Sequence, residues 1–310
     1  MTKNVVCYVQ RKRITDWKRK VLTRDDSTFI YGSSDDYVFA KMGSGDVLWV
    51  VASVPKRPPE IVARLDVELV APRTDSKLGI SEKLLSKFPK FKWFARGKGT
   101  SRFFGHNNAE RAFMQSTFLT SLGKSVRLGD EDASDWQGIY GKKFRRPLEI
   151  APSGESLFQQ ITDQPAVFIS WKWGDNRKRL VRDLAYALAD QGFTVWLDRL
   201  AMPASESLRR LANFPQALEI LLQDGYRHSS VLLAVESKRY GMKSEKSAKN
   251  WTLDEWNGVY DTNRKLHRVV YRPAYAKESQ IVSGNDLHLD DLNVKNIARK
   301  LREWWHLQDE

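Results

Sequence analysis

Residues 165–198 constrain the fold of this chain more than any other stretch. Ala166–Trp171 is a short, nearly unbroken apolar run with β-branched and aromatic residues, which is typical of a parallel strand buried on both faces. The apolar residues that follow have helical spacing and predict one buried helix face: Leu180, Val181, Leu184, Ala185 and Leu188. Gly192 is suited to cap this helix, and residues 193–197 predict the next strand. Together they predict the start of a parallel α/β domain.

The same alternation continues to the end of the chain. Further strands are predicted at residues 230–236 and 268–271, and helices at residues 206–225, 251–260 and 294–305. We expect Pro215 to interrupt the first of these helices and Gly225 to end it. In parallel sheets of this kind, ligands bind beyond the carboxyl ends of the strands. The ligand side should therefore include residues 170–175 and 198–205.

The composition excludes several classes of protein. The chain has 310 residues, which is enough for two domains that each bury a core. No apolar run approaches the roughly 20 residues of a membrane span, and no secretion signal is visible. Cys7 is the only cysteine, which excludes an internal disulfide and a cysteine-rich zinc site, and the five histidines lack ligand spacing. We therefore expect a cytoplasmic protein without a metal centre.

The positive charge is concentrated in the first half of the chain. The net charge is +13; residues 1–160 contain 28 Lys and Arg against 18 Asp and Glu, whereas residues 161–310 contain 23 against 20. Such asymmetry favours a polyanionic partner for the amino-terminal part, nucleic acid before membrane. A basic surface without any partner is the alternative.

Residues 1–150 are predicted to form a basic, β-rich recognition domain. Short runs of Val, Phe, Trp and Tyr between Gly, Pro, Ser and Asp clusters predict strands at residues 5–9, 36–40, 47–51 and 61–70. Such strands favour a small twisted sheet or barrel. The Gly45-Asp46 turn, the strand after it, Pro58-Pro59 and the next strand resemble PUA-like barrels, the group that includes EVE and ASCH domains. This resemblance implies a pocket for a base or modified base of DNA or RNA.

A basic and aromatic segment, residues 87–104, is the candidate nucleic-acid interface. Its cations alternate with aromatic side chains, and no acidic residue interrupts them. Cations neutralise phosphates, while aromatic faces stack on unpaired or flipped bases. A strand with its aromatic residues in the core and its lysines in solvent shows the same alternation, so both interpretations stay open. The candidate residues are Lys90, Lys92, Trp93, Arg96, Lys98 and Arg102.

The domain boundary is predicted between residues 150 and 165. The preceding residues 142–147 are basic and end in a proline, and Pro152-Ser-Gly154 and Gln159-Gln160 are typical of an exposed connection, with room for a short helix. We therefore expect three parts: a recognition domain at residues 1–150, a linker at residues 151–164, and an α/β domain at residues 165–310.

Four short signatures in the second half, taken together, resemble the TIR (Toll/interleukin-1 receptor) domain. They are Phe168-Ile-Ser170 with Asp175, Gly192-Phe-Thr-Val-Trp-Leu-Asp198, residues 231–236 with Ser237, and Trp251-Thr-Leu-Asp-Glu255. The resemblance spans residues 165 to about 305 and implies a flavodoxin-like parallel sheet. Some TIR domains are scaffolds that only assemble, and others cleave NAD+. The enzymes carry a glutamate on the helix after the third strand.

Glu255 is similar to that catalytic glutamate. It stands four positions after Trp251, so the carboxylate and the indole share one face of the predicted helix. The adjacent Asp254 is the alternative carboxylate if the helix is rotated. The resemblance also implies an NAD+ pocket lined by Phe168, Ser170, Lys172, Trp173, Asp198 and Trp251. The sequence departs from the common pattern in its first loop, which reads Trp171-Lys-Trp-Gly174.

The resemblance implies an NAD+ glycohydrolase or cyclase of the prokaryotic anti-phage defence type. NAD+ is then the substrate, no cofactor is needed, and ligand-driven oligomerisation controls the activity after the first domain senses nucleic acid or a modified base. The alternative is a scaffold without catalysis that assembles through contacts between TIR domains. A glycosyl transferase acting on nucleosides is a third hypothesis, because related α/β folds use a carboxylate on the same type of bond.

Overall fold

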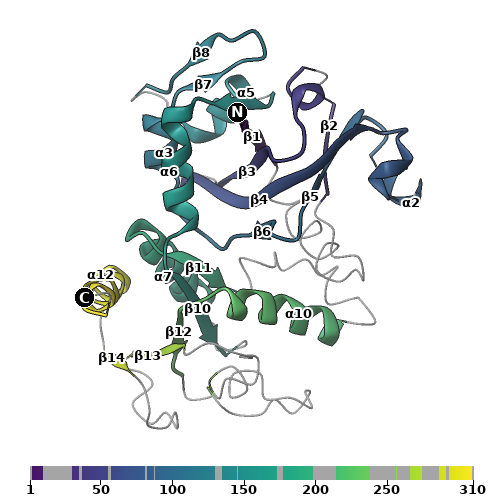
Figure 1. Ribbon diagram of the computed structural model, residues 1–310. Coiled ribbons are helices and arrows are strands. Elements are labelled where there is room, and N and C mark those ends of the chain that lie inside the picture. Colours follow the sequence, from purple (N-terminus) through teal and green to yellow (C-terminus); the bar gives the residue numbers. More distant parts are fainter. Residues whose placement is uncertain are drawn as a thin grey trace. The chain divides into compact units, whose positions relative to one another are not determined.

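The computed structural model describes residues 2–9, 30–34, 37–54, 57–80, 82–86, 88–129, 135–144, 146–172, 177–197, 214–237, 240, 256, 266–273, 286–290 and 293–308. The chain divides into two compact units, whose elements are labelled in Figure 1. Unit 1 comprises Met1–Phe104 and Asn108–Asp163, and unit 2 comprises Gly105–Asn107 and Gln164–Glu310. Among the described residues, no helix is both long and apolar enough to cross a membrane.

Unit 2 is built on a five-stranded parallel sheet. The strands are β10 (Ala166–Trp171), β11 (Thr194–Leu197), β12 (Val231–Val235), β13 (His267–Arg272) and β14 (Leu287–Asp290). Their order in the sheet is β11-β10-β12-β13-β14, and every neighbouring pair is parallel. This order is the flavodoxin-like arrangement expected from the sequence. Only β14 was not predicted, because its Leu-His-Leu-Asp sequence is short and half polar.

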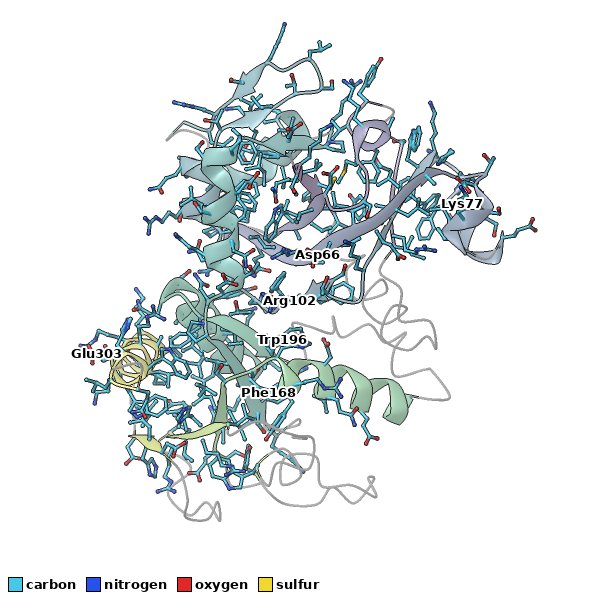
Figure 2. The ribbon with its side chains drawn as sticks, in the orientation of Figure 1. Asp66, Lys77, Arg102, Phe168, Trp196 and Glu303 are labelled. Carbon is cyan, nitrogen blue, oxygen red and sulfur yellow. The ribbon has the colours of Figure 1, made fainter. Side chains whose placement is uncertain are left out.

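Helices cover both faces of this sheet. The helix α7 (Lys178–Asp190) packs against α12 (Val294–His306), and both contribute to a core that includes Val167 and Ile169 of β10. The helix α10 (Phe214–Arg227) packs on the other face, where the ring of its Tyr226 lies 5.7 Å from that of Phe168. Figure 2 labels Phe168 and Trp196 beside α10. Successive β10 residues therefore face different helices, as the strand alternation requires.

Two glycines around this sheet behave differently from each other. Gly192 follows α7 with φ 81°, and its N–H donates to the carbonyl of Ala189 at 3.1 Å, so the predicted cap is confirmed. The prediction that Gly225 ends its helix is wrong, because α10 continues to Arg227. Gly225 instead permits close packing: a Cβ there would lie 3.1 Å from the Trp196 ring and 3.3 Å from the Phe168 ring. Pro215 lies in the first turn of the described helix, where proline is tolerated.

Unit 1 is a mixed unit with a nine-stranded sheet. The strand order is β2-β5-β4-β3-β1-β9-β7-β8, and β6 also pairs with β4. The pair β1 and β3 is parallel, and the other pairs are antiparallel. The bounds are β1 (Asn4–Tyr8), β2 (Ile30–Ser33), β3 (Val47–Val54), β4 (Arg57–Pro72), β5 (Trp93–Gly97), β6 (Arg102–Phe103), β7 (Phe118–Leu119), β8 (Ser125–Val126) and β9 (Leu148–Ile150).

Short helices complete unit 1: η1 (Phe39–Lys41), η2 (Ser76–Leu78), α2 (Glu82–Leu85), α3 (Glu110–Gln115), α5 (Trp136–Lys142) and α6 (Pro152–Thr162). In the described part of the chain, no pairing joins β2 to β8, so closure into the expected PUA-like barrel is not shown. The strand predicted at residues 36–40 is wrong where it is described, because Phe39 starts a 3-10 turn. The turn buries the Phe39 ring beside Tyr31, so this short apolar segment reaches the core without pairing as a strand.

The segment predicted as a linker with room for a short helix, residues 151–164, contains the helix α6, which belongs to unit 1. Its Phe158 is fully buried and lies in one core with Trp49 and Phe113, with ring centroids 5.7 and 5.3 Å from theirs. Pro152 occupies the first turn, and Gly154 packs closely against Ser116. The Pro, Ser and Gly residues that indicated a connection therefore start a helix of unit 1.

Candidate functional site

The carboxyl edge of the unit 2 sheet holds the candidate site. In the order β11-β10-β12-β13-β14, the chain goes from β10 to its neighbour β11 on one side. It then crosses back, and β12 pairs with β10 on the opposite side. Such a reversal opens a crevice beyond the carboxyl ends of the two strands that flank it. The register aligns Ser170 with Ala234 and Trp171 with Val235, so β10 and β12 end side by side.

Ser170 is the polar residue that β10 brings to this edge. Its side chain is almost fully buried, and its Oγ shares a hydrogen bond of 2.6 Å with the Tyr240 hydroxyl. Ser170 thus links the end of β10 to a residue that comes shortly after β12 and lies 70 positions later in the chain. Lys172 comes directly after the strand and is half-buried. These two predicted pocket residues therefore lie at the expected edge.

A buried ion pair occupies the neighbouring strand ends. Glu236 follows β12 with no exposed surface, and Arg272, the last residue of β13, has a side chain that is 30% exposed. The Arg272 Nε donates to Glu236 Oε2 at 2.5 Å, and its Nη2 donates to Oε1 at 3.4 Å. The hydrogen bond to Glu236 raises the pKa of Arg272 above its usual range, against an opposing effect of burial, so the guanidinium stays charged.

The sequence analysis did not select Glu236 or Arg272. Each is a charged residue at the end of a buried apolar run, where the chain reaches the ligand side of a parallel sheet. If β12 and β13 had been predicted to pair, Glu236 and Arg272 would have been expected at adjacent strand ends. Their partnership was missed because the register between the two strands was not known.

The other predicted pocket residues divide into two groups. Phe168 lies in the core against α10 and is only 2% exposed, so its ring does not reach the edge surface. Four residues lie outside the described part of the chain: Trp173, Asp198, Trp251 and Glu255. Of the helix predicted at residues 251–260, Trp256 is described; it is buried, and its carbonyl accepts a hydrogen bond of 2.9 Å from Arg268 Nε.

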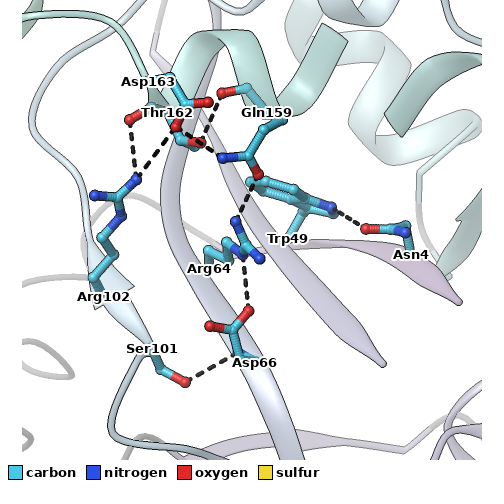
Figure 3. A network of polar contacts seen from close by, with 9 residues as sticks. All are labelled: Asn4, Trp49, Arg64, Asp66, Ser101, Arg102, Gln159, Thr162 and Asp163. Carbon is cyan, nitrogen blue, oxygen red and sulfur yellow. Dashed lines mark hydrogen bonds and ion pairs between the residues drawn. The ribbon is translucent and has the colours of Figure 1, made fainter. Parts of the chain in front are cut away.

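In unit 1, the two arginines of the candidate nucleic-acid interface make internal contacts. Arg102 Nη2 donates to the Thr162 carbonyl at 3.1 Å and lies 3.8 Å from Asp163 (Figure 3). Burial lowers the pKa of Arg102. Arg96 Nε pairs with Glu68 at 3.1 Å, and its Nη1 donates to the Lys77 carbonyl at 2.9 Å. Both guanidinium groups thus make contacts within unit 1.

The lysines of the same segment face solvent, and its aromatic rings pack inward. Lys90, Lys92 and Lys98 are exposed, whereas Trp93 is half-buried. Phe91 stacks on Phe88 with ring centroids 5.4 Å apart. Phe88 and Phe91 pack against a small core that contains Phe94, Leu78 and Ala71. The three lysines therefore lie on the surface, while the phenylalanine rings are occupied by packing.

A polar network next to Arg102 crosses unit 1 from strand to helix. Arg64 of β4 donates through Nη1 to Gln159 Oε1 of α6 at 2.6 Å and pairs through Nε with Asp66 at 2.9 Å. Its guanidinium also lies over the Trp49 ring, 5.3 Å from the centroid, and Trp49 Nε1 donates to Asn4 Oδ1 (Figure 3). This network ties α6 to the sheet. Within the described residues, no cluster of three His, Cys, Asp or Glu side chains could hold a metal ion.

The comparison with family models agrees with the geometry of unit 2. Residues 167–296 match the family model described as TIR domain. Unit 2 contains a TIR domain. The match starts at the second residue of β10 and ends within α12, so it includes the other four strands of the parallel sheet and its carboxyl edge. A search of curated proteins gave no match to this chain.

Proposed function

We propose that the TIR domain of this protein cleaves the bond between nicotinamide and ribose in NAD+. The observation that carries this proposal is the carboxyl edge of the sheet, where the Ser170–Tyr240 hydrogen bond and the Glu236–Arg272 ion pair both lie at strand ends within the residues that match a TIR domain. Crevices at this position bind nucleotides in sheets of the same strand order. A polar lining on a buried floor suits a ligand with ribose hydroxyls and phosphates.

In this proposal Glu255 is the catalytic residue. Nicotinamide is already a cationic leaving group, so cleavage needs stabilisation of an oxocarbenium-like ribose more than it needs a proton donor. A carboxylate against the ribose hydroxyls holds the sugar and opposes the developing positive charge. Ser170, Lys172, Trp173, Asp198 and Trp251 line the pocket. The reaction needs no metal or resident cofactor, and its product is ADP-ribose or the cyclic form.

Unit 1 is proposed to control this activity. Unrestrained NAD+ cleavage is toxic, which suits a defence protein that acts only after sensing an invader. The exposed lysines of residues 87–104 support nucleic acid or a modified base as the signal, and ligand-driven oligomerisation as the switch. Arg96 and Arg102, which make contacts within unit 1, do not contribute to that support.

The test is nicotinamide release from NAD+ by the purified full chain, with and without nucleic acid. Glu255→Gln keeps the size of the side chain and removes its charge, and we expect it to reduce turnover by at least about a hundredfold. Asp254→Asn is the matched control, because it changes the adjacent carboxylate by the same chemistry. Normal turnover by Glu255→Gln would remove the catalytic role, and loss only in Asp254→Asn would assign it to Asp254.

A scaffold without catalysis is the competing function, and the same samples separate the two. An oligomerised wild-type sample that releases no nicotinamide favours the scaffold. Base exchange on nucleosides without dependence on NAD+ would instead favour a glycosyl transferase.

A further inference from the structure

A segment of only three residues closes one edge of the TIR sheet. Gly105–Asn107, which we call the strap, belongs to unit 2, although the residues on both sides of it belong to unit 1. The strap pairs antiparallel with β11, the edge strand of the five-stranded sheet. His106 N donates to the Val195 carbonyl at 2.7 Å, and Val195 N donates to the His106 carbonyl at 2.7 Å. The strap therefore uses both outward backbone groups of Val195.

The contact between the strap and β11 requires glycine at residue 105, the first residue of the strap. A Cβ at residue 105 would overlap the carbonyl oxygen of Val195 and lie 2.6 Å from its carbonyl carbon. The Asn107 side-chain nitrogen donates to the Gly105 carbonyl at 3.0 Å and fixes the shape of the strap. The buried His106 ring meets the ring of Tyr186 in α7 edge-on, at 5.7 Å. These contacts define a specific seat on β11.

Both ends of the strap are tied to one strand of unit 1. Phe104 N donates to the Val62 carbonyl at 3.0 Å, and Ala109 N donates to the Pro59 carbonyl at 3.0 Å. Both acceptors lie in β4. Four residues separate these two anchors, and a chain this short has little slack. The residues on either side of the strap are therefore held by β4.

The β11 edge itself carries none of the usual protection against strand pairing. Edge strands are commonly guarded by lysine, proline or a bulge, whereas Thr194–Leu197 reads Thr-Val-Trp-Leu and pairs with β10 in regular register. The strap is the cover that replaces those devices. Without it, the N–H and C=O of Val195 offer one pairing site for an extended chain.

We propose that the strap is an autoinhibitory contact, and that its release lets β11 pair with β11 of a second copy of this chain. Two residues opposite each other in a hydrogen-bonded antiparallel pair exchange both backbone bonds, as His106 and Val195 do. Around a two-fold axis, Val195 of each copy makes the same exchange with Val195 of the other. This inference supplies the step that starts oligomerisation, and it rests on the proposed function only for the effect on NAD+ turnover.

The test uses the full chain with Gly105→Val and its matched control Gly99→Val. Residue 99 has no heavy atom within 4 Å of an added Cβ, so the control adds the same side chain without a clash. We expect Gly105→Val to speed hydrogen exchange at the Val195 amide and to strengthen self-association in sedimentation equilibrium, each by at least about tenfold. Gly99→Val should match the wild type in both measurements.

A second variant covers the case in which Gly105→Val does not fold. His106→Pro removes the donor to the Val195 carbonyl without adding a side chain at residue 105, and we expect the same two changes. Unchanged exchange at Val195 in both variants overturns the seat of the strap, and faster exchange without stronger association overturns the pairing with a second copy. Association without nicotinamide release would count against NAD+ cleavage and leave this inference standing.

Discussion

Glu236 is a fully buried carboxylate whose charge is balanced by the guanidinium of Arg272. The strand register places these residues at adjacent strand ends, so the pair depends on the sheet and not on any local motif. Burying one charge without its partner costs far more than the pair contributes. Loss of Arg272 would leave the Glu236 carboxylate buried without a counter-ion. It would also remove a side-chain contact between the ends of β12 and β13.

Arg272→Met tests the pair directly. We expect a loss of about 3 kcal/mol in the free energy of unfolding, because Glu236 stays buried without a counter-ion. Urea denaturation followed by circular dichroism measures it. The double variant Glu236→Leu/Arg272→Met removes both charges and should recover most of the loss. A single variant as stable as the wild type would show that the carboxylate finds another partner.

The helix α6 shows how a segment that is polar and rich in small residues becomes a structural element. Its Gln159 reaches Arg64 on the sheet, and its Phe158 fills the core between Trp49 and Phe113. Phe158 and Ile161 bury one face of the helix, although the sequence before them contains Pro, Ser and Gly. Unit 1 therefore includes residues that the composition alone assigned to a connection.

Phe158→Ala should destabilise unit 1 by about 3–5 kcal/mol, because the substitution leaves a cavity in an aromatic core. Thermal unfolding of the full chain measures the effect. The control is Gln160→Ala, an exposed position on the same helix, with an expected change within about 0.5 kcal/mol. Equal stability of the two variants would contradict the packing of α6 into the core of unit 1.

The positive charge of the whole protein is distributed unevenly between its two halves. The surplus of positive charge lies in residues 1–160, and three lysines of the 87–104 segment face solvent there. If these lysines contact phosphates, nucleic-acid affinity must fall steeply as salt rises. A solvated basic surface that binds nothing specific shows no such dependence on these residues.

Lys90→Gln/Lys92→Gln should reduce the slope of log affinity against log salt by about 1.5, measured by filter binding to single-stranded DNA. The control changes two exposed cations of unit 2, Lys178→Gln/Arg179→Gln, and should leave the slope unchanged. An equal reduction in both would indicate a response to net charge alone, and no measurable binding by the wild type would rule out a nucleic-acid signal at this segment.

Sequence patterns predicted four of the five strands of unit 2, because the signal for each lies within the element itself. The unbroken apolar runs of the buried strands and the period of 3.6 in α7 and α12 follow from local backbone geometry, and Gly192 marks a helix end through its left-handed conformation. These patterns also indicated which edge of the sheet carries polar residues. The sequence motif that ends in Glu255 stays a prediction, because that residue lies outside the described part of the chain.

The sequence by itself determined the parallel α/β unit, the basic first half and the edge where a ligand is expected, because each of these depends on neighbours within one element. Only the tertiary structure decided the Glu236–Arg272 pair, the docking of α6 and the seat of the strap on Val195. Those contacts join residues that lie 36, 109 and 89 positions apart, such as Trp49 with Phe158. Contacts between residues so far apart depend on strand register and on close packing of side chains, and neither produces a periodic pattern in the sequence.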